Sequence, residues 1–78
     1  MSFSVGTIIA ISKDKVIPEF WKECDGSIMS VQEYPLLFSV LGTKFGGDGI
    51  HTFILPNFKN YTQSTYIIRV ESDFFYFD

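Results

Sequence analysis

The clearest structural signal in the chain is the segment of residues 30–42, which reads SVQEYPLLFSVLG. Four apolar side chains follow the i, i+3, i+4, i+7 spacing of one helix face: Tyr34, Leu37, Phe38 and Leu41. Gly42 stands where a left-handed C-terminal cap belongs. The first residue of the helix is open, because Ser30 and Glu33 form a capping-box pattern whereas Pro35 favours a separate turn and a helix that starts at Pro35. One short helix is predicted.

Short β-strands are predicted on both sides of this helix. Residues 3–11 alternate between larger apolar and smaller side chains, and residues 20–24 form a second stretch closed by the turn dipeptide Asp25-Gly26. On the other side, residues 52–55 and 65–70 are rich in β-branched and aromatic side chains. These elements predict a small single domain of the α+β class, with short strands around one helix.

Composition excludes several classes of protein. With 78 residues, 46% of them hydrophobic, the chain predicts one domain that is too apolar for disorder. One cysteine and one histidine exclude an internal disulfide and a four-ligand zinc site, and we expect no metal and no cofactor. No apolar run reaches the roughly 20 residues of a membrane-spanning helix. The N-terminal residues 1–4 lack the features of a signal peptide.

Charge is distributed unevenly along the chain. Residues 1–69 contain six Lys/Arg and six Asp/Glu, so the net charge of −3 comes from Glu71, Asp73 and Asp78. No basic stripe is available for phosphates, so we expect no binding to duplex nucleic acid. We therefore divide the chain into a domain of residues 1–70 and an acidic, aromatic segment of residues 71–78.

The C-terminal segment is predicted to dock on a protein surface. Four consecutive aromatic side chains are costly to leave in water: Phe74, Phe75, Tyr76 and Phe77. Because the segment is acidic, its docking site is expected to be apolar with a basic rim. Two interpretations are open: it packs on a neighbouring subunit, extending the strand at residues 65–70, or it binds another protein.

No catalytic centre is predicted. Cys24 invites a nucleophile hypothesis, but the only histidine, His51, has no evident orienting carboxylate, and a small buried thiol beside Trp21 is the favoured interpretation. The loop of residues 46–49, Gly-Gly-Asp-Gly, is interpreted as a turn that needs positive φ angles, with a phosphate cradle as the alternative. Five aromatic residues are assigned to the core rather than to a ligand groove: Trp21, Tyr34, Phe38, Phe45 and Phe53.

Five landmarks follow one another in a recognisable order. They are Val5-Gly6-Thr7-Ile8; Trp21 with Cys24-Asp25-Gly26; Glu33-Tyr34-Pro35-Leu36-Leu37-Phe38; Leu41-Gly42-Thr43 with Phe45-Gly46-Gly47-Asp48-Gly49; and Thr52-Phe53-Ile54-Leu55-Pro56-Asn57. Over residues 5–57 this order and spacing resembles the phage tail collar domain, which occurs in short tail fibres and other tail-tip proteins. The resemblance implies structural roles for ten motif residues: Trp21, Cys24, Asp25, Gly26, Tyr34, Pro35, Gly46, Gly47, Leu55 and Pro56.

The resemblance implies a non-enzymatic structural or attachment protein of a phage tail. It also implies that the chain forms a homotrimer and that its further partners are other tail proteins. A short, apolar chain without disulfide or metal also favours an oligomer. The alternative is a small oligomeric phage protein in the host cytoplasm that sequesters a ligand or inhibits a host protein. The absence of a fibre shaft favours that alternative, and a pocket between subunits would use four basic residues: Lys22, Lys44, Lys59 and Arg69.

Overall fold

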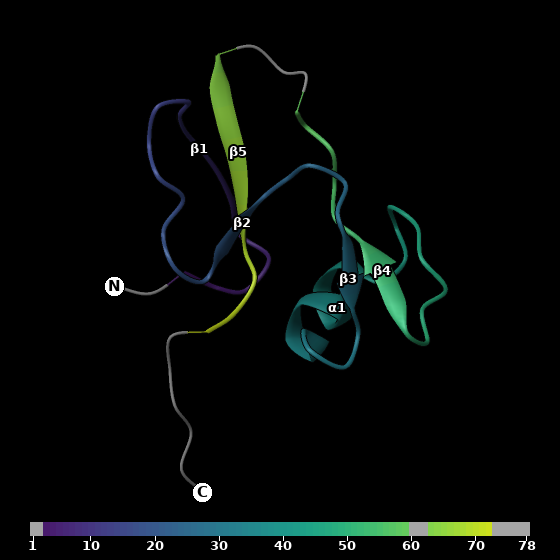
Figure 1. Cartoon of the computed structure of the whole chain (residues 1–78). Helices are drawn as coiled ribbons and strands as arrows, with labels where there is room; N and C mark the ends of the chain where they lie inside the picture. Colours follow the sequence, from purple (N-terminus) through teal and green to yellow (C-terminus); the bar gives the residue numbers. More distant parts are fainter. Residues whose placement is uncertain (1–2, 60–62, 73–78) are drawn as a thin grey trace, which may run out of the picture.

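Six short elements follow one another in the computed structural model, which describes residues 3–59 and 63–72 (Figure 1). They are β1 (Ile8–Ser12), β2 (Trp21–Glu23), β3 (Ile28–Ser30), α1 (Pro35–Leu41), β4 (Thr52–Ile54) and β5 (Ser64–Arg69). The strands form two separate antiparallel sheets. The predicted α+β class, with short strands and one helix, is confirmed.

The larger sheet has three strands in the order β1-β5-β2. Both pairs are antiparallel, with Ile9 opposite Ile67 and Trp21 opposite Arg69. The central strand β5 therefore has a strand neighbour on each side. The prediction that residues 71–78 pack on a neighbouring subunit and extend the strand at residues 65–70 stays a prediction, because residues 73–78 lie outside the described residues.

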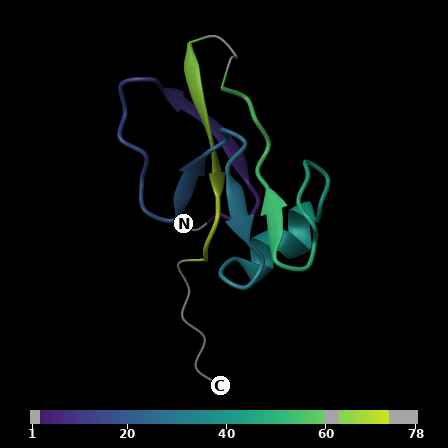
Figure 2. The ribbon, with the colours of Figure 1, turned by 45° about the vertical axis from the view of Figure 1, so that its right-hand side comes forward.

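The smaller sheet pairs β3 with β4, placing Met29 opposite Phe53. Figure 2 shows these two strands side by side and next to α1. The main core joins this unit to the larger sheet through seven buried residues: Cys24, Met29, Leu37, Phe53, Leu55, Ile68 and Val70. Strand β3 was not predicted, because three residues carry no measurable alternation and their conformation depends on a partner strand distant in sequence.

The helix begins at Pro35, and Tyr34 precedes it as the N-terminal cap residue. The Glu33 N–H donates to Ser30 Oγ over 3.2 Å, so the capping-box bond belongs to a separate turn before the helix. This is the second of the two predicted starts. Gly42 ends the helix with φ +58°, and its N–H donates to the Phe38 carbonyl over 2.7 Å.

Strand β1 begins at Ile8, five residues later than predicted. The Gly6 N–H donates to the Arg69 carbonyl, and the Arg69 N–H donates to the Thr7 carbonyl, each over 2.9 Å. Gly6 and Thr7 thus both lie opposite Arg69 of β5, as in a β-bulge. Gly6 takes φ +96°, a conformation that other residues rarely adopt, and this interrupts the predicted strand.

Candidate assembly surface

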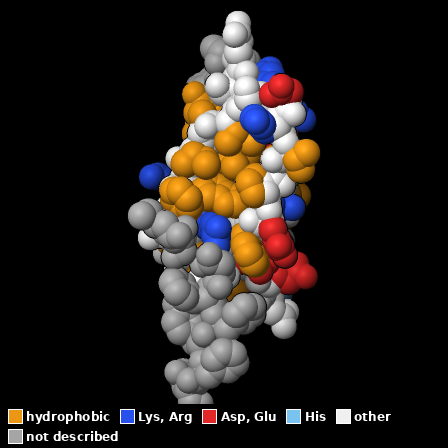
Figure 3. Space-filling view, turned by 90° about the vertical axis from the view of Figure 1, so that its left-hand side faces the viewer, with side chains coloured by type: hydrophobic (Ala, Val, Ile, Leu, Met, Phe, Trp, Pro, Cys, Tyr) orange, Lys and Arg blue, Asp and Glu red, His pale blue; other side chains and the backbone are white. Residues whose placement is uncertain are grey.

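The three-stranded sheet carries apolar side chains on both of its faces. Ile68 points into the main core, whereas its fully buried neighbour Ile67 lies outside that cluster. Because side chains alternate along strands, Ile67 shares the opposite face with Ile9, Ile11 and Trp21. We call these four residues the outer face. Figure 3 views this side of the molecule and shows hydrophobic side chains gathered at its centre, with both Lys or Arg and Asp or Glu side chains around them.

Aromatic rings and an arginine close one end of the outer face. The rings of Phe3 and Trp21 meet edge to face at 5.4 Å. The Arg69 guanidinium lies 4.9 Å from the centre of the Phe20 ring and 5.8 Å from the Trp21 ring, and Arg69 Nε donates to the Glu71 carbonyl over 2.6 Å. Phe20 adopts φ +73°, which is unusual for a bulky residue.

Arg69 is buried, so it is not available to line the basic pocket between subunits that the sequence suggested. Only 5% of this residue is exposed, since its side chain is enclosed by the aromatic rings and the backbone at the end of β5. The hypothesis of a basic pocket between subunits, made by Lys22, Lys44, Lys59 and Arg69, therefore loses its arginine. The burial of Arg69 could not be anticipated from sequence, because it depends on rings from a distant segment.

Two of the sequence motifs lie against each other. Three hydrogen bonds join residues 24–27 to residues 55–58: Gly26 N–H to the Pro56 carbonyl (3.2 Å), Phe58 N–H to the Cys24 carbonyl (2.8 Å) and Leu55 N–H to the Ser27 carbonyl (3.0 Å). Asp25 forms an isolated bridge with Asn57, and its Oδ1 accepts bonds from the Ser27 N–H and hydroxyl. These motif residues connect the two sheets.

The glycine-rich loop is organised by its own aspartate. Asp48 Oδ1 accepts hydrogen bonds from the N–H groups of Ile50, His51 and Thr52 at 2.8–2.9 Å. These bonds hold the pKa of the Asp48 carboxyl far below its ordinary value. Within the loop itself, the N–H groups of Gly46, Asp48 and Gly49 already donate to the Thr43 carbonyl, the Thr52 hydroxyl and the Thr52 carbonyl, so the geometry favours the turn interpretation.

Gly47 in this loop lies directly against β4. Its φ is +97°, and a Cβ atom placed there would lie 2.5 Å from the Phe53 Cα. The neighbouring Gly46 has φ +127° and packs against the Ile54 side chain. The two glycines thus allow the loop to approach the strand more closely than any side chain would permit.

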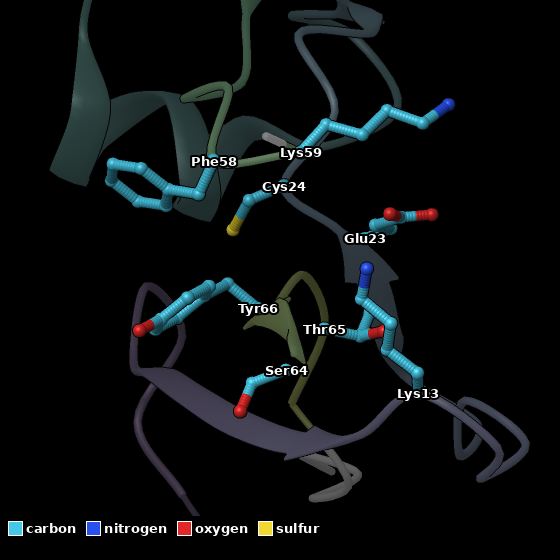
Figure 4. Close-up of a pocket in the computed structure, with 8 residues that line it drawn as sticks. All are labelled: Lys13, Glu23, Cys24, Phe58, Lys59, Ser64, Thr65 and Tyr66. Atoms are coloured by element: carbon cyan, nitrogen blue, oxygen red, sulfur yellow. The ribbon is translucent and has the colours of Figure 1, made fainter. Parts of the chain in front are cut away.

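Cys24 borders a pocket of about 200 Å³ between β5 and residues 57–59 (Figure 4). Its sulfur points between Phe58 and Tyr66, and only 1% of the residue is exposed. Burial, reinforced by the charges of Asp25 and Glu23, raises the pKa of the thiol to about 11. The thiol is therefore protonated at neutral pH, which disfavours a nucleophilic role.

The only histidine belongs to the glycine-rich loop. His51 is exposed, and its Nδ1 lies 3.5 Å from Asp48 Oδ2. Within residues 3–59 and 63–72, no group of three His, Cys, Asp or Glu side chains is placed to hold a metal ion.

The other predicted motif residues have structural positions. Tyr34 is half-buried before α1, Pro35 is the first residue of α1, and Leu55 and Pro56 are buried after β4. The assignment of Phe45 to the core is wrong, because 42% of this residue is exposed in the loop after α1. The predicted contact residues Phe74, Phe75, Tyr76 and Phe77 lie outside the described residues. The alternation of residues 3–11 already indicated that Ile9 and Ile11 share one face of a strand. What packs on that face depends on the tertiary structure.

The motif residues thus form turns, backbone contacts and core positions in a small domain. This domain also has apolar surface outside its main core. The chain belongs to the phage tail collar domain family, whose model matches residues 6–63. This family consists of structural domains of phage tails, as the sequence resemblance predicted. No curated protein is significantly similar to the chain. In the part of the chain that the structure describes, no helix has the length and apolar character needed to cross a membrane.

Proposed function

We propose that this protein is a non-enzymatic component of a phage tail that acts as a symmetric homotrimer in tail assembly or attachment. The observation that carries the proposal is the amount of apolar surface on a single copy. Among residues 3–59 and 63–72, eight large hydrophobic side chains are at least 40% exposed: Phe3, Ile8, Val16, Ile28, Leu36, Val40, Phe45 and Ile50. Apolar side chains that are exposed together usually mark contacts with other proteins, and Figure 3 shows hydrophobic side chains gathered over the outer face.

A trimer also supplies the binding strength that a small domain lacks. Each copy offers a short, rigid surface, such as the loop held by Asp48, and presents the exposed Ile50 there. Three copies on one particle convert weak individual contacts into a strong combined attachment, because the second and third contacts form at a high effective concentration.

The division of the chain into a domain of residues 1–70 and a segment of residues 71–78 is part of this proposal. The first residue of the segment is tied to the domain, because the Glu71 carbonyl accepts the Arg69 Nε bond. The aromatic residues that follow are assigned to contacts with other chains.

Two measurements test this proposal. Light scattering after size-exclusion chromatography at micromolar concentration is expected to give about three times 8.9 kDa. Mass spectrometry of purified phage particles is expected to find the chain among the tail proteins. A stable monomer contradicts the trimer, and particles without the chain contradict the tail function.

One observation favours a second candidate, a small oligomeric binding protein that acts on a ligand or a host protein. The pocket in Figure 4 combines aromatic residues with Lys13 and Lys59 at its border. Its volume lies below the roughly 300 Å³ of typical small-molecule sites, so a host protein is a better partner than a drug-sized ligand. Affinity capture from infected cells tests this candidate, with capture of tail proteins favouring the first function instead.

A further inference from the structure

Within the described part of the chain, strand β1 has a strand neighbour on one side only, which leaves its other edge free. It lies at the end of the order β1-β5-β2, and its register places Ile9 opposite Ile67. The Arg69 N–H bonds to Thr7, whereas the neighbouring Val70 N–H bonds to Phe20 beside β2. Bonding partners alternate along a strand, so Ile9 and Ile11 bond to β5, and the N–H and C=O groups of Ile8 and Ala10 point outward.

This edge is apolar on both faces of the sheet. Ile9 and Ile11 belong to the outer face, while Ile8 and Ala10 are exposed on the opposite face. Residues 8–11 read Ile-Ile-Ala-Ile and contain no charge. A strand edge of this kind, with unpaired polar backbone groups and apolar side chains, invites pairing with another strand.

The chain contains one segment with the matching pattern. Residues 74–77 read Phe-Phe-Tyr-Phe, so a strand formed there presents aromatic rings on both of its faces. The usual half-buried strand, with one polar face, would leave one face of the β1 edge uncovered.

The charges of the two segments are also complementary. Asp73 and Asp78 flank the aromatic run, and Lys13 and Lys15 follow β1. A strand pairing with β1 brings one of its ends close to these two lysines. Opposite charges at the ends of paired strands favour one alignment over others.

The path of the chain after β5 disfavours the same copy as the source of the added strand. The chain leaves β5 at Arg69, next to the Thr7 end of β1. A strand added to the free edge of β1 would lie two strand spacings from β5, about 9.6 Å. Residues 70–72 can span about 14 Å between Arg69 and Asp73, which is enough for this distance. However, the Val70 N–H is bonded to Phe20 on the β2 side, and the N-terminal residues bonded to Arg69 lie between the end of β5 and the free edge. A second copy is free of this restriction.

We propose that residues 73–78 of one copy bind as an added strand to the free edge of β1 in a neighbouring copy. This contact is head-to-tail, and three such contacts close a ring. The inference rests on the proposed oligomer and names the surfaces that form it. It also assigns the acidic, aromatic segment to a surface that is apolar and borders lysines.

The first test blocks the edge without breaking the sheet. Ala10→Pro removes an N–H that points away from β5, so the bonds between β1 and β5 remain. The control Ala10→Val keeps the N–H and suits a strand. Light scattering is expected to show the oligomer for the wild type and Ala10→Val and monomers for Ala10→Pro. Circular dichroism of all three proteins verifies that they are folded.

The second test does not depend on the proline variant. Full-length chains with Ala10→Cys are mixed with chains carrying one added cysteine at position 74, 75, 76 or 77, all in the Cys24→Ser background, and are then oxidised. Because side chains alternate along a strand, disulfides between the two kinds of chain are expected at every second position, either 74 and 76 or 75 and 77. Leu36→Cys on the exposed side of α1 replaces Ala10→Cys as the control. At roughly 10 micromolar protein, the favoured positions are expected to react about a hundred times faster than this control.

The outcomes separate this inference from the proposed function. An oligomer that survives Ala10→Pro and shows no alternating disulfides overturns the added strand and leaves the trimer standing. A wild-type chain that is monomeric overturns both. Alternating disulfides between different chains support the inference even where Ala10→Pro fails to fold.

Discussion

The N–H of Gly26 donates a hydrogen bond to the carbonyl of Pro56 over 3.2 Å. Gly26 has φ +78°, and a Cβ atom there would lie 3.3 Å from the Asn57 amide nitrogen. The turn after β2 and the segment after β4 therefore approach each other through backbone atoms. This contact joins the two sheets, and it explains why a glycine suits position 26 of this chain.

Replacing Gly47 with alanine is expected to destabilise the fold more than the same change at Gly42. Both glycines have positive φ, but only the new Cβ at position 47 overlaps the backbone of Phe53, while nothing lies within 4 Å at position 42. The overlap adds at least about 1 kcal/mol to the loss of stability. Urea unfolding of the two variants measures the difference. Equal losses would show that the loop moves freely away from β4.

The glycine-rich loop is expected to make stability depend on acid pH through Asp48. The pKa of its carboxyl is lower in the folded chain than in the unfolded chain, so its contribution is complete above the ordinary value of about 4. The contribution is lost as the pH falls below that value. Thermal unfolding of Asp48→Asn between pH 7 and pH 3 is expected to show a lower Tm at pH 7 and a weaker decline in acid. The control Asp14→Asn removes an exposed carboxylate outside the loop and is expected to retain the wild-type decline.

The substitution Cys24→Ser is expected to lower stability by about 1–2 kcal/mol and to leave assembly intact, because a hydroxyl replaces a buried thiol. Chemical denaturation measures the stability, with Cys24→Ala as the control for the loss of volume alone. The native thiol is also expected to react slowly with thiol reagents at pH 7, since its pKa is raised to about 11. Loss of assembly at unchanged stability would assign Cys24 a functional role.

The substitution Arg69→Lys is expected to cost about 2 kcal/mol of stability, because a lysine cannot donate the Nε bond to Glu71 while stacking on the Phe20 ring. The control Lys22→Arg changes an exposed side chain on β2 and is expected to have almost no effect. Calorimetry compares the two variants. If Arg69→Lys unfolds at the wild-type temperature, the aromatic rings hold the end of the sheet without the guanidinium.

Local patterns in the sequence were sufficient for part of the fold. The helix face with Leu37 at its centre follows from the 3.6-residue period, and Pro35 marks the first helical residue because it lacks a backbone N–H. The loop glycines were predicted from the need for positive φ. In the family match over residues 6–63, the order of motifs carried more information than any single motif.

The tertiary structure decided the features that join distant residues. Strand β3 exists because Ile28 pairs with Ile54, and three residues show no period that would reveal such a pairing. The burial of Arg69 requires rings from residues 20 and 21, and no local pattern indicates this. The central position of β5 and the free edge of β1 are likewise properties of strand order. A sequence determines strand order only through the combined energy of all pairings, whereas a helix or turn depends on neighbours within a few residues.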